Sequence, residues 1–159
     1  MIRFKLSSLV AIAALTLSLY PLAACADHRE QATVTEKVVK VDGKEMKNAK
    51  VKLRGSKDTV LKDVDYNELR VDSSGSADLE VSGRANTLIL DVSGSSTIHA
   101  EDLEADEVEI DMSGSADLYV KANKSFRIDG SGSGKIYLHG KGEVVRHRVT
   151  GNVRVYRKK

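Results

Sequence analysis

A short Ser-Gly motif recurs along the chain at nearly equal spacing, and this repeat limits the possible folds more than any other feature. The motif reads Ser-Gly-Ser four times and Thr-Gly-Asn once. Its glycines are Gly75, Gly94, Gly114, Gly132 and Gly151, which lie 19, 20, 18 and 19 residues apart. Such periodicity is typical of a solenoid, in which each repeat forms one coil and stacks on the next.

Apolar residues recur at fixed distances from each of these glycines. The two columns before the glycine are Leu69, Leu88, Val108, Phe126 and Val145, and then Val71, Leu90, Ile110, Ile128 and His147. The two columns after it are Leu79, Ile98, Leu118, Ile136 and Val155, and then Val81, Ala100, Val120 and Leu138. Apolar positions two apart indicate β-strands. Each unit therefore predicts two short strands around a Ser-Gly turn, followed by a segment of variable length.

Stacking such units predicts an all-β protein, a single-stranded parallel β-helix of about five to six coils of 18–20 residues. A lone unit cannot pair its own backbone groups or bury its apolar face, whereas stacked copies do both. A β-sandwich also has short, regularly spaced strands, but it does not explain why like residues recur at this period.

The stretch from Gln31 to Lys52 fits the repeat poorly, and we interpret it as an N-terminal cap, followed by a degenerate first coil around Gly55. We expect the β-helix domain to span residues 34–159, with the cap at about 34–52 and the best repeats at 69–156. Glu101 to Asp106 is predicted to form a longer loop.

The N-terminal region is typical of a secretion signal. A short cationic stretch, Met1 to Lys5, precedes a mostly apolar stretch without charge, Leu6 to Leu19. The next residues include Leu22-Ala23-Ala24-Cys25, which resembles the lipobox of bacterial lipoproteins. That resemblance implies cleavage before Cys25 and attachment of lipid to its thiol.

We therefore expect a lipoprotein signal peptide over residues 1–24 and a lipid-anchored tether over residues 25–33. The membrane would then be a partner of the chain through the lipid on Cys25. By the same resemblance, Ala26 in the second position implies the outer membrane, with the domain facing the periplasm or the cell surface. An alternative stays open, because Ala24-Cys25-Ala26 also fits ordinary cleavage after Ala26, which would leave a soluble periplasmic structural protein.

The charge balance argues against nucleic acid as a partner. The chain has 25 Lys and Arg against 23 Asp and Glu, and removing Arg3 and Lys5 with the signal leaves 23 against 23. Nucleic-acid binding needs a surplus of cations to displace counterions. A single Cys also excludes an internal disulfide and a thiolate zinc cluster.

The repeated pattern apolar-x-apolar-Asp-x-Ser-Gly-Ser resembles a known family. It is seen in Leu88 to Ser95 and again in Val108 to Ser115. The pattern is similar to the head GIN domain of autotransporter adhesins, and the resemblance covers about Leu69 to Tyr156. It implies a right-handed parallel β-helix in an exported, often lipid-anchored protein, and it brings no catalytic residues with it.

An aspartate column accompanies the glycines, and together they form a turn ladder of Asp72, Asp91, Asp111 and Asp129 with Gly75, Gly94, Gly114 and Gly132. One hypothesis is a calcium-stabilised β-helix, since carboxylates are calcium ligands. The structural alternative, which we favour, is that each Asp accepts the backbone N–H two residues on and stabilises the turn. We therefore expect no metal and no cofactor.

Catalytic chemistry is not expected either. The four histidines, His28, His99, His139 and His147, fall in the tether or in three different columns, so none pairs with another as metal ligands or as a base beside a nucleophile. The serines beside the glycines are expected to satisfy turn backbone. The chain is therefore predicted to act by binding or as a scaffold.

Two features indicate where a partner could bind. Tyr119, Tyr137 and Tyr156 occupy one column with Glu80 and His99, between two inward apolar columns, so they should form an exposed stripe suited to a protein or polysaccharide ligand. The alternative is that the rings only stabilise neighbouring strands. The second feature is a basic cluster of Arg146, Arg148, Arg154, Arg157, Lys158 and Lys159. It is either a cap that blocks end-to-end stacking or a contact for anionic lipid or polysaccharide.

Overall fold

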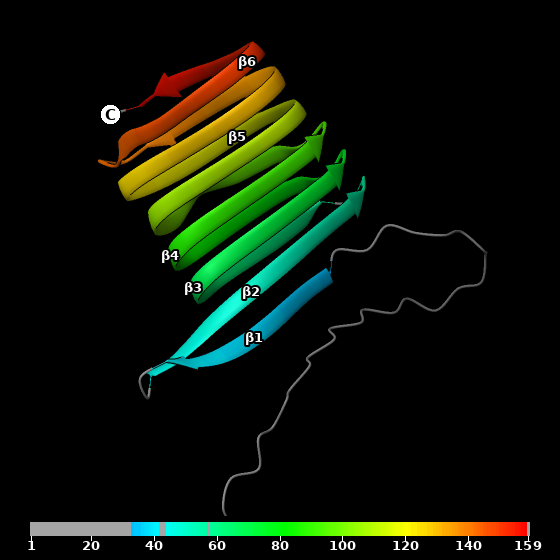
Figure 1. Ribbon diagram of the computed structural model, residues 1–159. Helices are drawn as coiled ribbons and strands as arrows, with labels where there is room; N and C mark the ends of the chain where they lie inside the picture. Colours follow the sequence, from blue (N-terminus) through cyan, green and yellow to red (C-terminus); the bar gives the residue numbers. More distant parts are fainter. Residues whose placement is uncertain (1–32, 42–43, 57, 159) are drawn as a thin grey trace, which may run out of the picture.

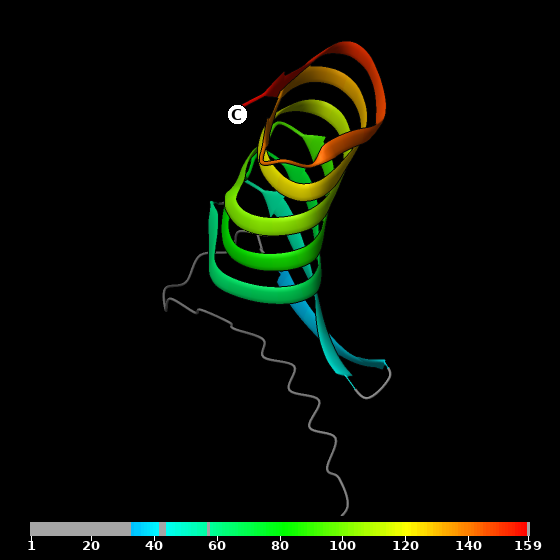
Figure 2. The same ribbon diagram turned by 90° about the vertical axis from the view of Figure 1, so that its left-hand side faces the viewer.

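The computed structural model describes residues 33–41, 44–56 and 58–158. These residues form strands that pair in chain order into one sheet, and the sheet winds into a solenoid (Figures 1 and 2). The strands are β1 (Thr33–Val41), β2 (Lys44–Gly55), β3 (Thr59–Gly75), β4 (Asp78–Gly94), β5 (Thr97–His139) and β6 (Glu143–Arg157). No helix is present in this part of the chain, so none here is long and apolar enough to cross a membrane.

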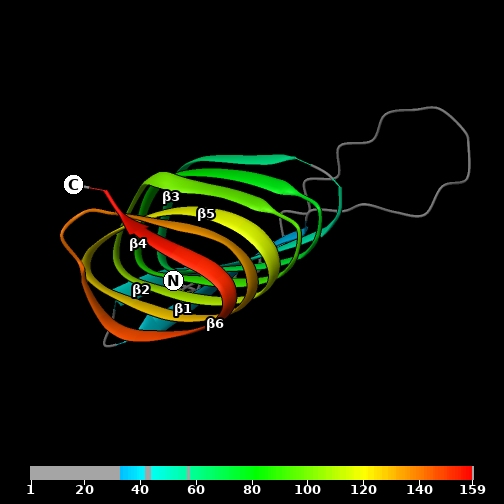
Figure 3. The ribbon, with the colours of Figure 1, turned by 90° about the horizontal axis from the view of Figure 1, so that it is seen from above.

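Strands β2 to β6 pair in parallel, each displaced by about one coil from the one before. Gly75 lies beside Gly55 and Gly94 beside Gly75. The long strand β5 continues through more than one coil before β6 pairs with it, with Gly132 beside Gly151 (Figure 3). The predicted all-β parallel β-helix is confirmed, with about six turns.

A hairpin forms the N-terminal end of the solenoid. β1 runs antiparallel to β2, from Thr33 beside Lys52 to Val41 beside Lys44. The second half of β2, from Asn48 onward, already pairs in parallel with β3. The first coil therefore begins at Asn48, within the stretch that the sequence assigns to the cap.

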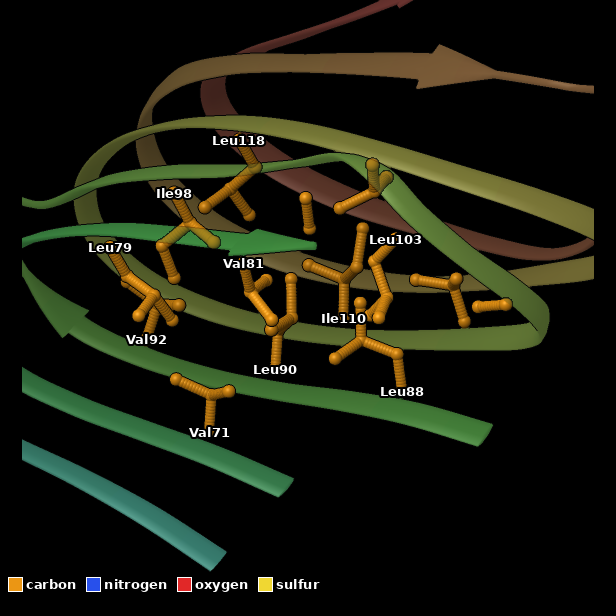
Figure 4. Packing of buried hydrophobic residues seen from close by; sticks show 14 of the residues in the cluster. Val71, Leu79, Val81, Leu88, Leu90, Val92, Ile98, Leu103, Ile110 and Leu118 are labelled. Atoms are coloured by element: carbon orange, nitrogen blue, oxygen red, sulfur yellow. The ribbon is translucent and has the colours of Figure 1, made fainter. Parts of the chain in front are cut away.

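Stacked aliphatic side chains fill the interior of the solenoid and alternate with outward-facing residues along each strand. Leu88, Leu90 and Leu118 have 0% of their surface exposed. Figure 4 shows these side chains gathered inside successive coils. Burying each one contributes about 1.5–3 kcal/mol. A core of this kind explains how the chain folds with few aromatic residues.

The repeated glycines stand at corners where the backbone admits no other residue. Gly94 and Gly114 have φ angles of +136° and +139°, which residues with a Cβ rarely adopt. A Cβ on Gly114 would clash with the carbonyl oxygen of Gly94, one coil below. The glycine repeat therefore follows from both the sharp corner and the close approach of stacked backbones.

The segment Glu101 to Asp106 is not the predicted loop but part of strand β5. Its apolar residues, Leu103 and Ala105, alternate with acidic ones and are fully buried. A register shift after the pair Glu80 and His99 accommodates one extra residue in β5. The loop prediction was wrong because the many acidic residues obscured a strand period of two.

The position predicted for Val145 in the first apolar column is also wrong. Phe126 pairs with Val144, and after a register shift Arg127 pairs with Arg146. Val145 therefore lies in a bulge and is 58% exposed. Counting back from the glycine could not detect this bulge, because an extra residue changes which side chain faces inward.

Candidate functional site

Four aromatic side chains on successive coils form a stack on the outside of the solenoid, which we call the aromatic ladder. Its members are His99, Tyr119, Tyr137 and Tyr156. Each strand alternates inward and outward residues, so Tyr119 faces outward between the buried Leu118 and Val120. Parallel pairing without a register slip then places Tyr156 beside Tyr137.

The rings of the ladder lie face to face. Ring centroids are 4.7 Å apart for His99 and Tyr119, 4.6 Å for Tyr119 and Tyr137, and 5.2 Å for Tyr137 and Tyr156. The ring planes differ by 11°, 9° and 17° along the ladder. Stacked pairs at this separation are worth about 0.5–1.5 kcal/mol each beyond the area they bury.

This stacking decides which part of each ring a ligand can reach. Tyr119 and Tyr137 have a ring neighbour on both faces, so their edges and phenolic hydroxyls remain for contact. Tyr156 is 39% exposed, and both Tyr119 and Tyr137 are half-buried. The ladder therefore offers a row of hydroxyl groups that can donate and accept hydrogen bonds.

Acidic side chains flank the ladder on its lower coils, which are those nearer the N-terminal hairpin. Asp78 and Asp117 accept hydrogen bonds from the backbone N–H groups of Thr97 and Lys135 on the next coil, both at 3.1 Å. Glu101 lies two residues after His99, and its carboxylate is 3.3 Å from His99 Nδ1. These carboxylates thus have partners within the protein.

Cationic side chains flank the ladder on its upper coils. Lys135 and Arg154 precede Tyr137 and Tyr156 by two residues and lie beside each other in the sheet. Lys158 follows Tyr156 by two, and its Nζ lies 5.6 Å from the centroid of the Tyr137 ring. Sequence reasoning described the tyrosines and the basic cluster as separate features and missed that Arg154 and Lys158 of that cluster lie beside the tyrosines.

The aspartates of the predicted turn ladder contact cationic side chains. Asp72 is bonded by Lys50 Nζ at 2.7 Å and by Arg70 Nε at 3.0 Å, and Arg70 also reaches Asp91 at 3.2 Å. Burial of Asp72 by itself would raise its pKa, but hydrogen bonds and charge from the two cations outweigh it, so its pKa is lowered. The prediction that each Asp accepts the backbone N–H two residues on gains no support among the described residues. Backbone N–H groups are accepted by Asp78 and Asp117 instead, and these groups belong to the next coil and not to the turn.

In the rest of the aspartate column, Asp129 contacts a cation and Asp111 has no ion-pair partner among the described residues. Asp111 stacks beside Asp91, and Asp129 is 3.1 Å from Arg146 Nε and lies beside Arg148 in the sheet. Among the residues that the structure describes, no group of three His, Cys, Asp or Glu side chains could hold a metal ion.

The three described histidines lie in different columns of the solenoid. His99 belongs to the ladder and His139 follows Tyr137 by two residues. His147 pairs with the buried Ile128 but is itself exposed, unlike the other members of the apolar column in which the sequence placed it. Cys25, which carries the lipidation hypothesis, and His28 lie outside the described residues. No geometry is therefore available for the tether or the signal.

Sequence reasoning also passed over Tyr66. Its hydroxyl donates a hydrogen bond to Glu36 of β1 and so ties the N-terminal hairpin to the coil formed by β3. Burial, the hydrogen bond and the carboxylate charge raise the pKa of Tyr66 to about 12. The one signal in the sequence was that Tyr66 falls outside the column of Tyr119, Tyr137 and Tyr156.

The comparison with protein families agrees with this architecture. A family model described as "Putative auto-transporter adhesin, head GIN domain" matches residues 31–142, which is more than half of the chain. The chain belongs to the head GIN domain family. The match covers the N-terminal hairpin and most coils of this head GIN domain, up to the start of β6.

Two further comparisons gave no relatives. Neither a curated protein nor a solved structure matches the chain. The family and the solenoid fold indicate an exported or cell-envelope protein of adhesin-like type.

Proposed function

We propose that this head GIN domain is a non-enzymatic binding module of the cell envelope, and that the aromatic ladder is its binding face. Adhesin-like domains act by surface contact, and a rigid stack of coils presents an extended surface for this purpose. Tyr supplies contact area and a polar tip at low entropy cost, which suits a recognition surface.

The observation that carries this proposal is the continuity of the ladder. Three tyrosines and one histidine occupy one outward column on four successive coils, with hydroxyl groups repeated along the solenoid. A purely structural solenoid needs only strand-forming residues in an outward column. Regular spacing of identical polar groups suits a ligand that is itself extended.

The test is to replace Tyr119, Tyr137 and Tyr156 together by Thr, which keeps strand propensity. On the binding hypothesis the variant stays folded, with its unfolding midpoint lowered by no more than the loss of the ring stacking, and it loses adhesion to cells or immobilised glycans. The competing view is that the rings only support neighbouring strands. A variant that unfolds readily, or one that adheres as well as the wild type, would favour that view.

We further propose that lipid on Cys25 anchors the module, with cleavage before that residue. The support is the lipobox-like Leu22-Ala23-Ala24-Cys25 and the envelope location indicated by the family. Cys25→Ser should abolish lipid labelling and release the protein from membranes. Recovery of a soluble wild-type protein that begins at Asp27 would instead support the alternative cleavage after Ala26 and a soluble periplasmic role.

A further inference from the structure

The charge beside the aromatic ladder changes sign along the solenoid axis. On the lower, N-terminal coils the outward positions next to or within its column carry Asp78, Glu80, Glu101 and Asp117. The one cation there among the described residues, Lys121, pairs with Glu104 at 3.9 Å. On the upper coils, the flanking positions carry the cations Lys135, Arg154 and Lys158. The upper half of the ladder is therefore a face that combines phenolic hydroxyls with positive charge.

These cations differ from several paired cations elsewhere on the solenoid surface. Elsewhere Lys50 pairs with Asp72, Arg84 with Glu104 and Lys124 with Asp106, at separations of 2.7, 3.6 and 2.8 Å. We call Lys135, Arg154 and Lys158 the ladder cations. Within residues 33–41, 44–56 and 58–158, no carboxylate lies within ion-pair distance of any of them.

Two of the ladder cations also lie directly beside each other. Lys135 and Arg154 are register partners on β5 and β6, on the same side of Tyr137 and Tyr156. Like charges at directly paired strand positions repel and weaken the pairing. The carboxylate of Asp117, one coil before Lys135, lies on one side of this pair and accepts the Lys135 backbone N–H, whereas no carboxylate of the described residues lies within ion-pair distance of Arg154. An anion bound from outside would relieve the remaining repulsion.

We propose that this upper half of the ladder binds an anionic polysaccharide, with Lys135, Arg154 and Lys158 contacting its acidic groups and the tyrosine hydroxyls its sugar hydroxyls. The proposal rests on the proposed function and names the ligand class for the same face. Lys and Arg side chains form charge-assisted hydrogen bonds to carboxylate and sulfate. Because the coils repeat, a cation and a tyrosine hydroxyl recur side by side, so an extended polymer can make both kinds of contact more than once.

The ring stacking favours a polysaccharide over a nucleic acid. Single-stranded nucleic acids bind aromatic surfaces by stacking bases on open ring faces. Tyr119 and Tyr137 have neighbouring rings on both faces, so no base can stack on them. A sugar polymer needs only the ring edges and hydroxyls, which this arrangement leaves free.

The charge gradient favours a narrow polymer over a membrane surface. A lipid bilayer lying along this flank would face Asp78, Glu80 and Glu101 as well as the cations. Anionic headgroups would be repelled by those carboxylates. A polymer chain can contact the upper coils alone, where the cations gather.

The experiment measures binding of the full-length chain, in detergent, to immobilised dextran sulfate and to alginate, with neutral dextran of matched size as the control polymer. We expect retention on at least one acidic polymer and little on neutral dextran, and we expect retention to fall as salt rises, because exposed charges are screened. Retention on dextran sulfate assigns sulfate as the preferred acidic group, and retention on alginate assigns carboxylate.

The variants replace the ladder cations together, as Lys135→Gln, Arg154→Gln and Lys158→Gln. Loss of three exposed ion pairs should weaken binding roughly tenfold. A matched control removes three cations from other columns, as Arg84→Gln, Lys124→Gln and Arg127→Gln, and should bind within about twofold of the wild type. Urea unfolding of both triple variants checks that the fold is retained.

Four outcomes would overturn the proposal. They are equal losses in the two triple variants, equal binding to neutral dextran, stronger binding to polyglutamate than to either acidic polysaccharide, and cation-dependent binding to phosphatidylglycerol vesicles without binding to the polymers. The adhesion assay separates this inference from the proposed function. If the ladder-cation variant adheres like the wild type while the tyrosine variant does not, the ladder remains the binding face and only the ligand class is wrong.

Discussion

The coil around Gly114 and the coil around Gly151 follow the same plan, yet they differ in how many neighbours they have. Gly114 stacks on Gly94 and has further coils above it, whereas Gly151 stacks on Gly132 alone in the described part of the chain. Residues with the same register therefore experience different surroundings in the two coils.

The interior shows this difference most clearly. Leu118 of the inner coil is fully buried, and Val155, in the same column of β6, is half-buried. In a stack of repeats, each coil is stabilised by the interfaces with its neighbours. An apolar side chain of the same type therefore contributes less to the free energy of unfolding in β6 than in β5. Charge differs as well: Arg84, Lys121 and Lys124 of the inner coils have ion-pair partners, whereas Arg154 and Lys158 beside the ladder have none among the described residues.

The largest effect that tests this comparison is expected from Gly114→Ala. Backbone strain of about 1–3 kcal/mol combines with overpacking against Gly94 of about 1–3 kcal/mol, and coils on both sides prevent a shift. We expect a loss of about 3 kcal/mol or more in the free energy of unfolding, measured by urea denaturation. Gly151→Ala has a similar clash but only one neighbour, so β6 can move away at a cost of roughly 1–2 kcal/mol.

The control for these glycines is Gly130→Ala. Gly130 is buried, but its φ is not in the positive range, and an added Cβ would have no heavy atom closer than 3.8 Å. We expect its unfolding free energy to change by less than about 1 kcal/mol. Equal losses for Gly114→Ala and Gly151→Ala would contradict the view that neighbouring coils prevent relaxation.

A smaller effect is expected when side chains in one interior column are truncated. Leu118→Ala leaves a cavity in a closed core and should cost about 2–5 kcal/mol. Val155→Ala removes less apolar area from a half-open position and should cost under about 1.5 kcal/mol. Urea unfolding of both variants measures the two losses in unfolding free energy. A loss for Val155→Ala as large as for Leu118→Ala would show that the interior at β6 is as well packed as in the inner coils.

The smallest effect concerns the charges on the first coils. The pKa of Asp72 is lowered in the folded state, so its stabilising contribution is present above the unfolded pKa of about 3.9 and is lost as pH falls through the folded pKa. Asp72→Asn should cost up to about 1 kcal/mol at pH 7, since these ion pairs are partly exposed.

This cost should disappear in acid, and unfolding midpoints of wild type and Asp72→Asn measured from pH 7 down to pH 2 should converge there. Asp102→Asn, at an exposed position of β5, is the control and should show no such convergence. A constant difference between wild type and Asp72→Asn at every pH would show that the carboxylate acts through packing and not through its charge.

Much of the fold could be predicted because the repeat reports directly on stacking. Glycine recurs where one backbone corner approaches the next, and Leu or Ile recurs where a side chain enters the core. The segment around Leu103 could not be placed from composition, because its acidic residues point outward and its apolar ones are few. The bulge that exposes Val145 depends on pairing with a strand 18 or 19 residues away, which no local pattern records.

The amino-acid sequence by itself determined the coil, its period, the inward columns and the outward position of the tyrosines, because each depends only on strand alternation and on the spacing of glycines. The tertiary structure alone decided which outward columns become neighbours and how their charges pair. It brought Lys135 beside Arg154 and both beside the tyrosine stack, and it gave the aspartates cations as partners. The physical reason is that these contacts join residues on different coils, where one bulge changes which side chains meet.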